Sequence, residues 1–192
     1  MSPTTFIQMR KMRDDAVNLY LVGFMGTGKS TIGRRVAEEL KMRFVDSDHA
    51  IEKKYRMAIP EIFEKHGEAH FRALEREFVD TGHPKRGMVV ACGGGLVVQD
   101  GMLETLENKG IVVCLVASEE TIIQRVSSNP NRPLLNVDDQ RERIRKLIAE
   151  REPIYRKVNT QLMTDMRPVP SVVGHLARTY LHEAARFKNR SA

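Results

Sequence analysis

Residues 23–31 read GFMGTGKST, and this stretch decides the fold. It fits the P-loop pattern G-x-x-x-x-G-K-[ST], which runs here from Gly23 to Ser30. A short apolar run at residues 18–22 precedes it and predicts a strand, and apolar residues at helical spacing over residues 31–41 predict a helix after it. A glycine-rich loop between a strand and a helix is a phosphate-binding context, so the pattern indicates a nucleotide site rather than a chance turn.

Each residue type in this loop suits a triphosphate. Glycines let backbone N–H groups approach phosphate oxygens without a Cβ in the way. The positive end of the following helix dipole favours the same anion. Lys29 can reach the β- and γ-phosphates, and the Ser30 hydroxyl can ligate Mg²⁺. We therefore expect the loop to bind ATP together with Mg²⁺.

The rest of the chain alternates short apolar strands with amphipathic helices. Further strands are predicted at residues 43–46, 88–91, 111–117 and 161–164. Their continuous apolar character indicates a parallel sheet that is covered by helices on both faces. We therefore predict an α/β fold of three layers.

Ligands of such a sheet bind beyond the carboxyl ends of its strands, so the residues that follow each strand are candidates for the site. Asp46 and Asp48 follow the second predicted strand, and Gly93, Gly94 and Gly95 follow the third. The third strand carries no terminal aspartate, so Asp46 is the nearest candidate for the acid on the magnesium side. The alternative for Asp48 is a structural role as the cap of the next helix.

Three arginines from different parts of the chain form the other candidate set. Arg72 lies within a predicted helix, with Glu75 at the i+3 spacing of an ion pair. Arg132 lies in a proline-bounded segment, residues 129–136, which we predict to be a lid over the phosphates. Arg151 lies near the end of a long predicted helix. Each alone suits a solvated surface, but together with the P-loop they favour one anionic cavity.

The length of 192 residues suits one domain. Residues 1–17 are expected to form a flexible N-terminal extension, residues 18–182 the P-loop domain, and residues 183–192 a frayed tail. No apolar run approaches the roughly 20 residues of a membrane span. Cys92 and Cys114 lie in apolar runs and are expected to be reduced core thiols, which favours a cytoplasmic location.

The formal net charge is +6, which suits either nucleic acid or small anionic ligands. No block of like charge dominates, and basic residues are not interleaved with aromatic ones. Aromatic residues make up only 6% of the chain. The charge therefore favours small anions, and we expect no nucleic-acid partner.

An ordered set of motifs over about residues 18–182 resembles the shikimate kinase family. Beyond the P-loop the set comprises Asp46-Ser47-Asp48, Ile62-Phe63, Gly67-Glu68, Phe71-Arg72 with Glu75, Cys92-Gly-Gly-Gly95, Asn131-Arg-Pro-Leu-Leu135, and Arg151 with Pro153 and Tyr155. The resemblance implies the fold of the small nucleoside monophosphate kinases, with a five-stranded parallel sheet, a lid and a substrate-binding helical region. It also implies transfer of the γ-phosphate of ATP to the 3-hydroxyl of shikimate, a step of chorismate and aromatic amino-acid biosynthesis.

The resemblance also implies a role for each matched residue. The substrate would be bound by Asp48, Arg72, Gly93, Gly94, Gly95 and Arg151. ATP would be bound by Gly26, Thr27, Gly28, Lys29, Ser30, Thr31, Arg125, Arg132 and Arg167. Ser30 would ligate Mg²⁺, and Asp46 would reach the ion through water. Near Arg167 the spacing departs from the family pattern, which weakens the assignment of the adenine contacts.

Three residues would carry the chemistry. Lys29 and Arg132, with Mg²⁺, would take up charge on the moving phosphoryl group. Asp48 would hold the attacking hydroxyl, either as a general base or only as a positioning group. The expected partners are shikimate and ATP, without nucleic acid or membrane, and the expected state is a monomer.

Rival functions stay open at this point. A kinase for another small hydroxy acid, such as gluconate, would keep the P-loop but not Asp48, Arg72 and Arg151 together. A nucleotide-binding module would bind ATP without turnover. A basic nucleic-acid protein would bind DNA or RNA with a steep salt dependence.

Overall fold

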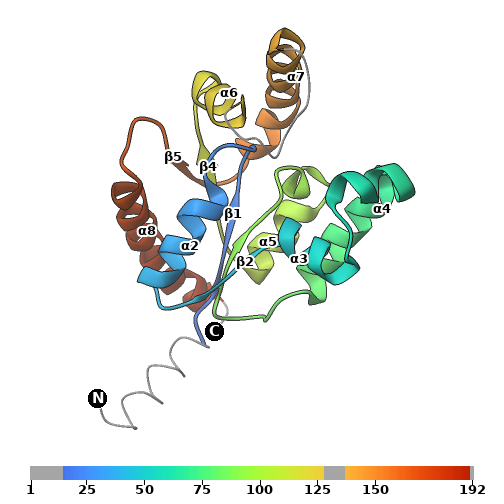
Figure 1. The fold of residues 1–192 in the computed structure, drawn as a ribbon. Helices are drawn as coiled ribbons and strands as arrows, with labels where there is room; N and C mark the ends of the chain where they lie inside the picture. Colours follow the sequence, from blue (N-terminus) through green and yellow to red (C-terminus); the bar gives the residue numbers. More distant parts are fainter. Residues whose placement is uncertain (1–14, 128–136, 191–192) are drawn as a thin grey trace.

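The computed structural model describes residues 15–127 and 137–190, with side chains over residues 15–126 and 141–187. Five parallel strands form one sheet in the order β2-β3-β1-β4-β5 (Figure 1). The strands are β1 (Asn18–Val22), β2 (Arg43–Asp46), β3 (Met88–Ala91), β4 (Gly110–Val116) and β5 (Thr160–Met163). Each lies within one residue of its predicted range, so the predicted parallel sheet is confirmed.

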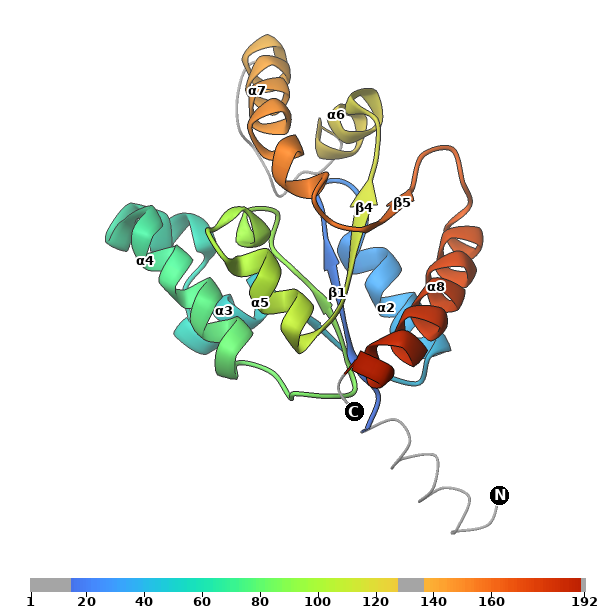
Figure 2. The ribbon, with the colours of Figure 1, turned by 180° about the vertical axis from the view of Figure 1, so that it is seen from behind.

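Helices cover both faces of this sheet. They are α2 (Lys29–Glu39), α3 (Ser47–Tyr55), α4 (Ile59–Thr81), α5 (Met102–Lys109), α6 (Glu119–Ser127), α7 (Val137–Tyr155) and α8 (Val169–Arg190), with a 3₁₀ turn, η1, at Leu96–Val98. In Figure 1, α2 and α8 lie on one side of the sheet and α3, α4 and α5 on the other, and Figure 2 shows the same division from behind. In both views α6 and α7 stand beyond the carboxyl end of β4.

Alternate residues of β1 show why the fold has three layers. Leu19 and Leu21 point into an apolar cluster with side chains of α2 and α8. Tyr20 and Val22 point into a second cluster, which includes side chains of α3, α4 and α5. All four are fully buried, so the central strand needs apolar residues at these four positions.

The fold extends past both boundaries that we predicted for it. Before residue 18, the carbonyl of Ala16 accepts a hydrogen bond from the amide of Gly87 at 2.7 Å, and the carbonyl of Val17 accepts one from Tyr180 Oη at 2.8 Å. At the other end, α8 continues to Arg190 instead of ending near residue 182. These contacts tie the residues before β1 to the segment before β3 and to the middle of α8. Figure 1 shows the start of β1 and the end of α8 at the amino edge of the sheet.

Two other expectations concern the lid segment and membrane-spanning helices. The predicted lid at residues 129–136, with Arg132, lies outside the described residues, as do residues 1–14. None of the helices that the structure describes has the length and apolar character that crossing a bilayer requires.

Candidate active site

The P-loop follows β1 and leads directly into α2. Gly23 has a φ of +130°, and a Cβ there would overlap the carbonyl oxygen of Leu115 in β4, so only glycine fits. Gly28 has a φ of +94° and precedes the first residue of α2 without a side-chain cap. The first N–H groups of α2 are therefore left for an anion. Thr27 is buried, and its hydroxyl donates to the carbonyl of Phe24 at 2.8 Å, which holds the loop in shape.

The Lys29 side chain folds back onto the P-loop. Its Nζ donates to the carbonyl oxygens of Gly23 at 2.8 Å and Phe24 at 2.9 Å. Loss of hydration lowers the pKa of Lys29 to about 8, although the carboxylates of Asp48 and Asp46 oppose this shift. A bound triphosphate would supply the negative charge that the ammonium lacks in the free loop.

Ser30 and Asp46 form a pair of oxygen ligands beside the loop. The Ser30 hydroxyl donates to Asp46 Oδ2 at 2.5 Å. The other carboxylate oxygen of Asp46 accepts from the amides of Asp48 at 3.1 Å and His49 at 3.4 Å. Asp46, and not Asp48, is therefore the cap of α3, which begins at Ser47. The Asp48 side chain is thus not used as the cap.

The glycines after β3 make room for charged side chains from three other elements. A Cβ on Gly93 would overlap Asp48 Oδ1 of α3, and one on Gly95 would lie 2.5 Å from Arg72 Nη1 of α4. A Cβ on Gly94 would lie 3.8 Å from Arg151 Nη1 of α7. The structure therefore brings one carboxylate and two guanidinium groups together around this turn, as the sequence predicts.

Arg72 is held by carboxylates on its own helix. Gly67, with φ +80° and ψ 169°, divides α4 into two segments, and Arg72 lies on the second. Its Nη1 pairs with Glu75 and its Nη2 with Glu68, both at 2.7 Å. Loss of hydration lowers the pKa of Arg72, but hydrogen bonds to these carboxylates outweigh it and leave the pKa raised. The predicted ion pair between Arg72 and Glu75 is confirmed. The two carboxylates fix the orientation of the Arg72 guanidinium from two sides.

Glu75 is itself a buried carboxylate, with only 1% of its side chain exposed. Burial raises its pKa, and the hydrogen bond from Arg72 opposes this shift. Gln99, which follows η1, donates from Nε2 to Glu75 Oε2 at 2.8 Å. A chain of contacts thus runs from Gln99 through Glu75 to Arg72. Gln99 had no signal in the sequence, because only the fold brings it to α4.

Arg151 is placed by the last turn of α7. Its guanidinium carbon lies 5.8 Å from the ring centroid of Phe24, within the P-loop. One turn later, the Tyr155 hydroxyl donates to the carbonyl of Gly94 at 2.5 Å. Burial raises the pKa of Tyr155 to about 12, so it stays a hydrogen-bond donor. These contacts join α7 to both the P-loop and the glycine turn.

Ser47 joins the aspartates to the same turn. It is fully buried, and its hydroxyl accepts a hydrogen bond from the amide of Gly93 at 2.8 Å. The sequence placed Ser47 between Asp46 and Asp48 without indicating this contact. Because β2 and β3 are neighbours in the sheet, the residues that end them meet at its carboxyl edge.

Arg125 and Arg167, the two arginines predicted to contact adenine, lie in α6 and in the segment between β5 and α8. Arg125 of α6 donates from Nη1 to the carbonyl of Gly26 at 3.0 Å and also contacts Thr164, which follows β5. Arg167 donates to Ser171 Oγ at 3.5 Å. Arg125 therefore ties the P-loop to the end of β5, and the contact of either arginine with adenine stays a prediction.

Comparison with known proteins agrees with this geometry. The shikimate kinase family model matches residues 25–181. A shikimate kinase of Thermodesulfovibrio yellowstonii is 41% identical over 163 residues, which cover 85% of this chain and 94% of that protein. A shikimate kinase of Acinetobacter baylyi is 45% identical over 145 residues, which cover 76% of this chain and 81% of that protein.

Solved structures give the same result. The shikimate kinase from Acinetobacter baumannii in complex with shikimate has a TM-score of 0.81 and 38% identity, and the match covers 90% of this chain and 97% of that chain. A gluconokinase from Sinorhizobium meliloti has a TM-score of 0.61 at only 13% identity, with 93% of this chain and 98% of that chain covered, which shows the fold alone. From the family model and these relatives, the chain belongs to the shikimate kinase family.

Proposed function

We propose that this protein transfers the γ-phosphate of ATP to the 3-hydroxyl of shikimate, giving shikimate 3-phosphate and ADP. The observation that carries this proposal is the meeting of Asp48, Arg72 and Arg151 around the glycine turn, beside the P-loop. One carboxylate and two guanidinium groups suit a substrate that has both a hydroxyl and a carboxylate. A relative with a TM-score of 0.81 is described in complex with shikimate, which supports this choice of substrate.

On the nucleotide side, the backbone of Gly26–Thr31 would bind the phosphates. Lys29 would exchange its two carbonyl partners for phosphate oxygens, so its charge would move from the loop to the triphosphate. Arg132 would add a second cation over the γ-phosphate. Its role rests on the family resemblance, because the residue lies outside the described part of the chain.

Ser30 and Asp46 fit a magnesium ion by their chemistry. Both offer oxygen ligands, and their oxygens lie 2.5 Å apart at the start of α2. Ser30 would ligate Mg²⁺ directly, and Asp46 would hold it through water. When bound, the ion would neutralise negative charge on the β- and γ-phosphates.

On the acceptor side, Asp48 would orient the attacking hydroxyl. Its carboxylate lies against Gly93, and the Ser47 hydroxyl contacts it at 3.4 Å. Arg72 and Arg151 would bind the substrate carboxylate and so fix the ring relative to the phosphate. Phosphoryl transfer needs positioning and charge neutralisation rather than covalent help, and these residues supply both.

We further propose that the enzyme acts as a cytoplasmic monomer. Both cysteines are buried free thiols, which suits a reducing compartment. Size-exclusion chromatography with light scattering tests the monomer directly.

The deciding experiment measures ADP release with shikimate, with gluconate and with no acceptor, each with and without Mg²⁺. Mg²⁺-dependent ADP release with shikimate, and none with gluconate or without an acceptor, supports the proposal. Turnover with gluconate would support the rival kinase, and ATP binding without turnover on either acid would support a nucleotide-binding module. Arg72→Lys is the matched variant, because it keeps the charge and removes the planar fork.

A further inference from the structure

The guanidinium of Arg72 is only partly used by its own helix. Of its five N–H groups, those on Nε and Nη2 reach Glu68 Oε1 at 3.2 and 2.7 Å, and one on Nη1 reaches Glu75 Oε2 at 2.7 Å. Among the described residues, one N–H on each terminal nitrogen is therefore left without an acceptor. Two N–H groups placed in this way can donate side by side to a single carboxylate.

These two N–H groups face the glycine turn. A Cβ on Gly95 would lie 2.5 Å from Nη1 and 2.8 Å from Nη2 of Arg72, and 2.9 Å from the central carbon of the guanidinium. The terminal nitrogens are thus the guanidinium atoms nearest to the turn, where the proposed substrate would lie. The number of N–H groups that Arg72 can offer there depends on how many of them Glu68 and Glu75 accept.

Glu75 depends on protein groups for its hydrogen bonds. Its side chain is only 1% exposed, so it has little access to water. Its Oε2 atom accepts from Arg72 Nη1 at 2.7 Å and from Gln99 Nε2 at 2.8 Å. Its Oε1 atom would lie 3.0 Å from a Cβ on Gly93, and the same Cβ would overlap Asp48 Oδ1, so a second carboxylate lies on that side. In the described part of the chain, the donors to Glu75 are therefore Arg72 and Gln99.

Backbone hydrogen bonds on both sides fix the position of Gln99. Its backbone amide donates to the carbonyl of Leu96 in η1 at 3.4 Å, and its carbonyl accepts from the amide of Met102, the first residue of α5, at 3.0 Å. Its side chain is half-buried and reaches α4 from this fixed point. The side-chain amide of Gln99 is therefore a donor that Glu75 can use without any rearrangement.

We propose that Gln99 is a positioning residue for the substrate carboxylate, because it satisfies Glu75 and so leaves both terminal N–H groups of Arg72 to the substrate. This role rests on the proposed function, since it deepens the assignment of Arg72 to the carboxylate of shikimate. Without the Gln99 amide, the buried Glu75 would draw a second N–H from Arg72. The substrate carboxylate would then be held by one N–H of this guanidinium instead of two. Gln99 acts through Glu75 and needs no contact with either substrate.

The first test is Gln99→Met, which removes the amide and keeps a side chain of similar length. Calorimetry should show about tenfold weaker shikimate binding, the lower end of the range for one hydrogen bond between charged groups. The KM for shikimate should rise by the same factor. The KM for ATP and kcat should stay within about twofold of the parent values, because neither the P-loop nor Asp48 is changed.

Two comparisons test whether the effect passes through Glu75 to the carboxylate. Methyl shikimate has an ester in place of the carboxylate, so it lacks the charge that the paired N–H groups bind. Gln99→Met should therefore change its affinity by less than about twofold. In a Glu75→Gln background the buried side chain carries no charge, so Gln99→Met should change shikimate affinity by less than about twofold there as well.

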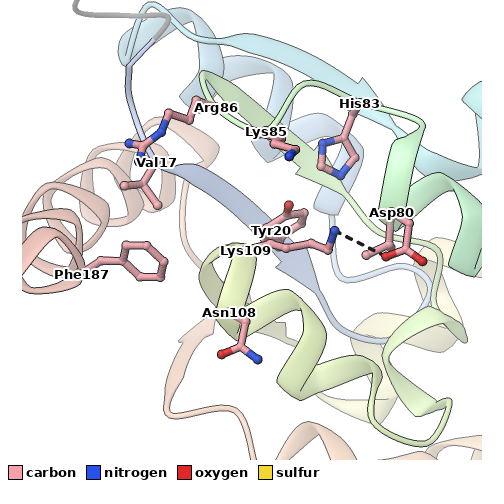
Figure 3. A pocket seen from close by; sticks show the side chains of 10 residues that line it. Val17, Tyr20, Asp80, His83, Lys85, Arg86, Asn108, Lys109 and Phe187 are labelled. Atoms are coloured by element: carbon pink, nitrogen blue, oxygen red, sulfur yellow. Dashed lines mark ion pairs between the residues drawn. The ribbon is translucent and has the colours of Figure 1, made fainter. Parts of the chain in front are cut away.

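The matched control breaks another contact between the same parts of the fold. Lys109 of α5 pairs with Asp80 of α4 at 3.4 Å, at the amino edge of the sheet (Figure 3). Lys109→Met removes this contact without changing Glu75, and it should leave shikimate affinity unchanged. Melting temperatures show whether each variant folds. If Gln99→Met does not fold, Gln99→Ser removes the same donor by shortening the side chain.

Three results would overturn the role of Gln99. The first is a folded Gln99→Met variant that binds shikimate as tightly as the parent. The second is equal weakening of shikimate and methyl shikimate, which would mean a general defect of the site. The third is undiminished weakening by Gln99→Met in the Glu75→Gln background. A parent chain that does not bind shikimate would overturn the proposed function itself, so the two failures are distinguishable.

Discussion

Truncating Arg72 should damage both substrate binding and stability, and the two effects can be separated. Arg72 pairs with Glu75, which is 1% exposed, and with Glu68, which is 64% exposed. The pair with Glu68 contributes little, because exposed pairs are worth about 0–1 kcal/mol. Arg72→Ala leaves the buried Glu75 carboxylate with Gln99 as its remaining hydrogen-bond donor. The stability effect therefore comes from Glu75.

The magnitude follows from these contacts. Removing one partner of a buried ion pair costs about 3–5 kcal/mol. Because the bond from Gln99 remains and Arg72 is 24% exposed, we expect the free energy of unfolding to fall by only about 2–3 kcal/mol. For a chain of this length that lowers the melting temperature by about 4–12 °C. Shikimate affinity should fall roughly ten- to a hundredfold, the worth of hydrogen bonds between charged groups, and ATP affinity should stay unchanged.

A double variant separates the two effects. Arg72→Ala/Glu75→Gln removes the uncompensated charge, so most of the lost stability should return while shikimate binding stays weak. Arg151→Ala is the matched control, because it removes the other guanidinium without exposing a buried carboxylate. Urea unfolding gives the stability, and calorimetry with shikimate and ATP separately gives the affinities. If the double variant regained shikimate affinity, Arg72 would not bind the carboxylate, and our division of the site would be wrong.

Other predictions concern the P-loop, the glycine turn and Arg132. Lys29→Ala and Arg132→Ala should each fold and lower kcat by about a hundredfold or more, the loss expected for one preorganised charge, and near-normal turnover in either would refute its role. Since the pKa of Lys29 is about 8 in the free loop and an anion raises it, ATP binding should take up a proton near pH 8 and almost none near pH 6.5. Calorimetry in buffers of different ionisation enthalpy measures this uptake, and Lys29→Met should abolish it; identical heats in all buffers would contradict the shift. Gly95→Ala should displace the Arg72 fork and weaken shikimate binding about tenfold, whereas Gly174→Ala in α8 should change nothing, and equal affinities would refute the crowding argument.

Much of the fold could be predicted because local signals agreed with one another. The P-loop, the apolar strands and the helical spacing each pointed to a parallel sheet, and all five strands lie within one residue of their predicted ranges. The ends of the fold had no such local signal: Val17 is hydrogen-bonded to α8, and α8 continues to Arg190. Contacts such as Tyr180 with Val17 decide where the fold ends, and such contacts join residues that are far apart in the sequence.

The charged residues of the candidate site could also be predicted, but their supports could not. Asp48, Arg72 and Arg151 have charged side chains, a carboxylate and two guanidinium groups, that are recognisable in the sequence as candidates for a binding site. Gln99 and Ser47 look like ordinary polar residues until the fold places them against Glu75 and Gly93. The choice of Asp46 over Asp48 as the cap of α3 has the same origin, because the residue at which α3 begins decides which carboxylate caps it.

The position of the two ends of the fold has a practical consequence. The start of β1 and the end of α8 meet at the amino edge of the sheet, and the proposed active site lies at its carboxyl edge. A tag, a surface tether or a second enzyme joined close to Asp15 or Arg190 would therefore be attached on the side away from the entrance for nucleotide and substrate. The same geometry would let fusion to neighbouring enzymes occur without rebuilding the catalytic edge.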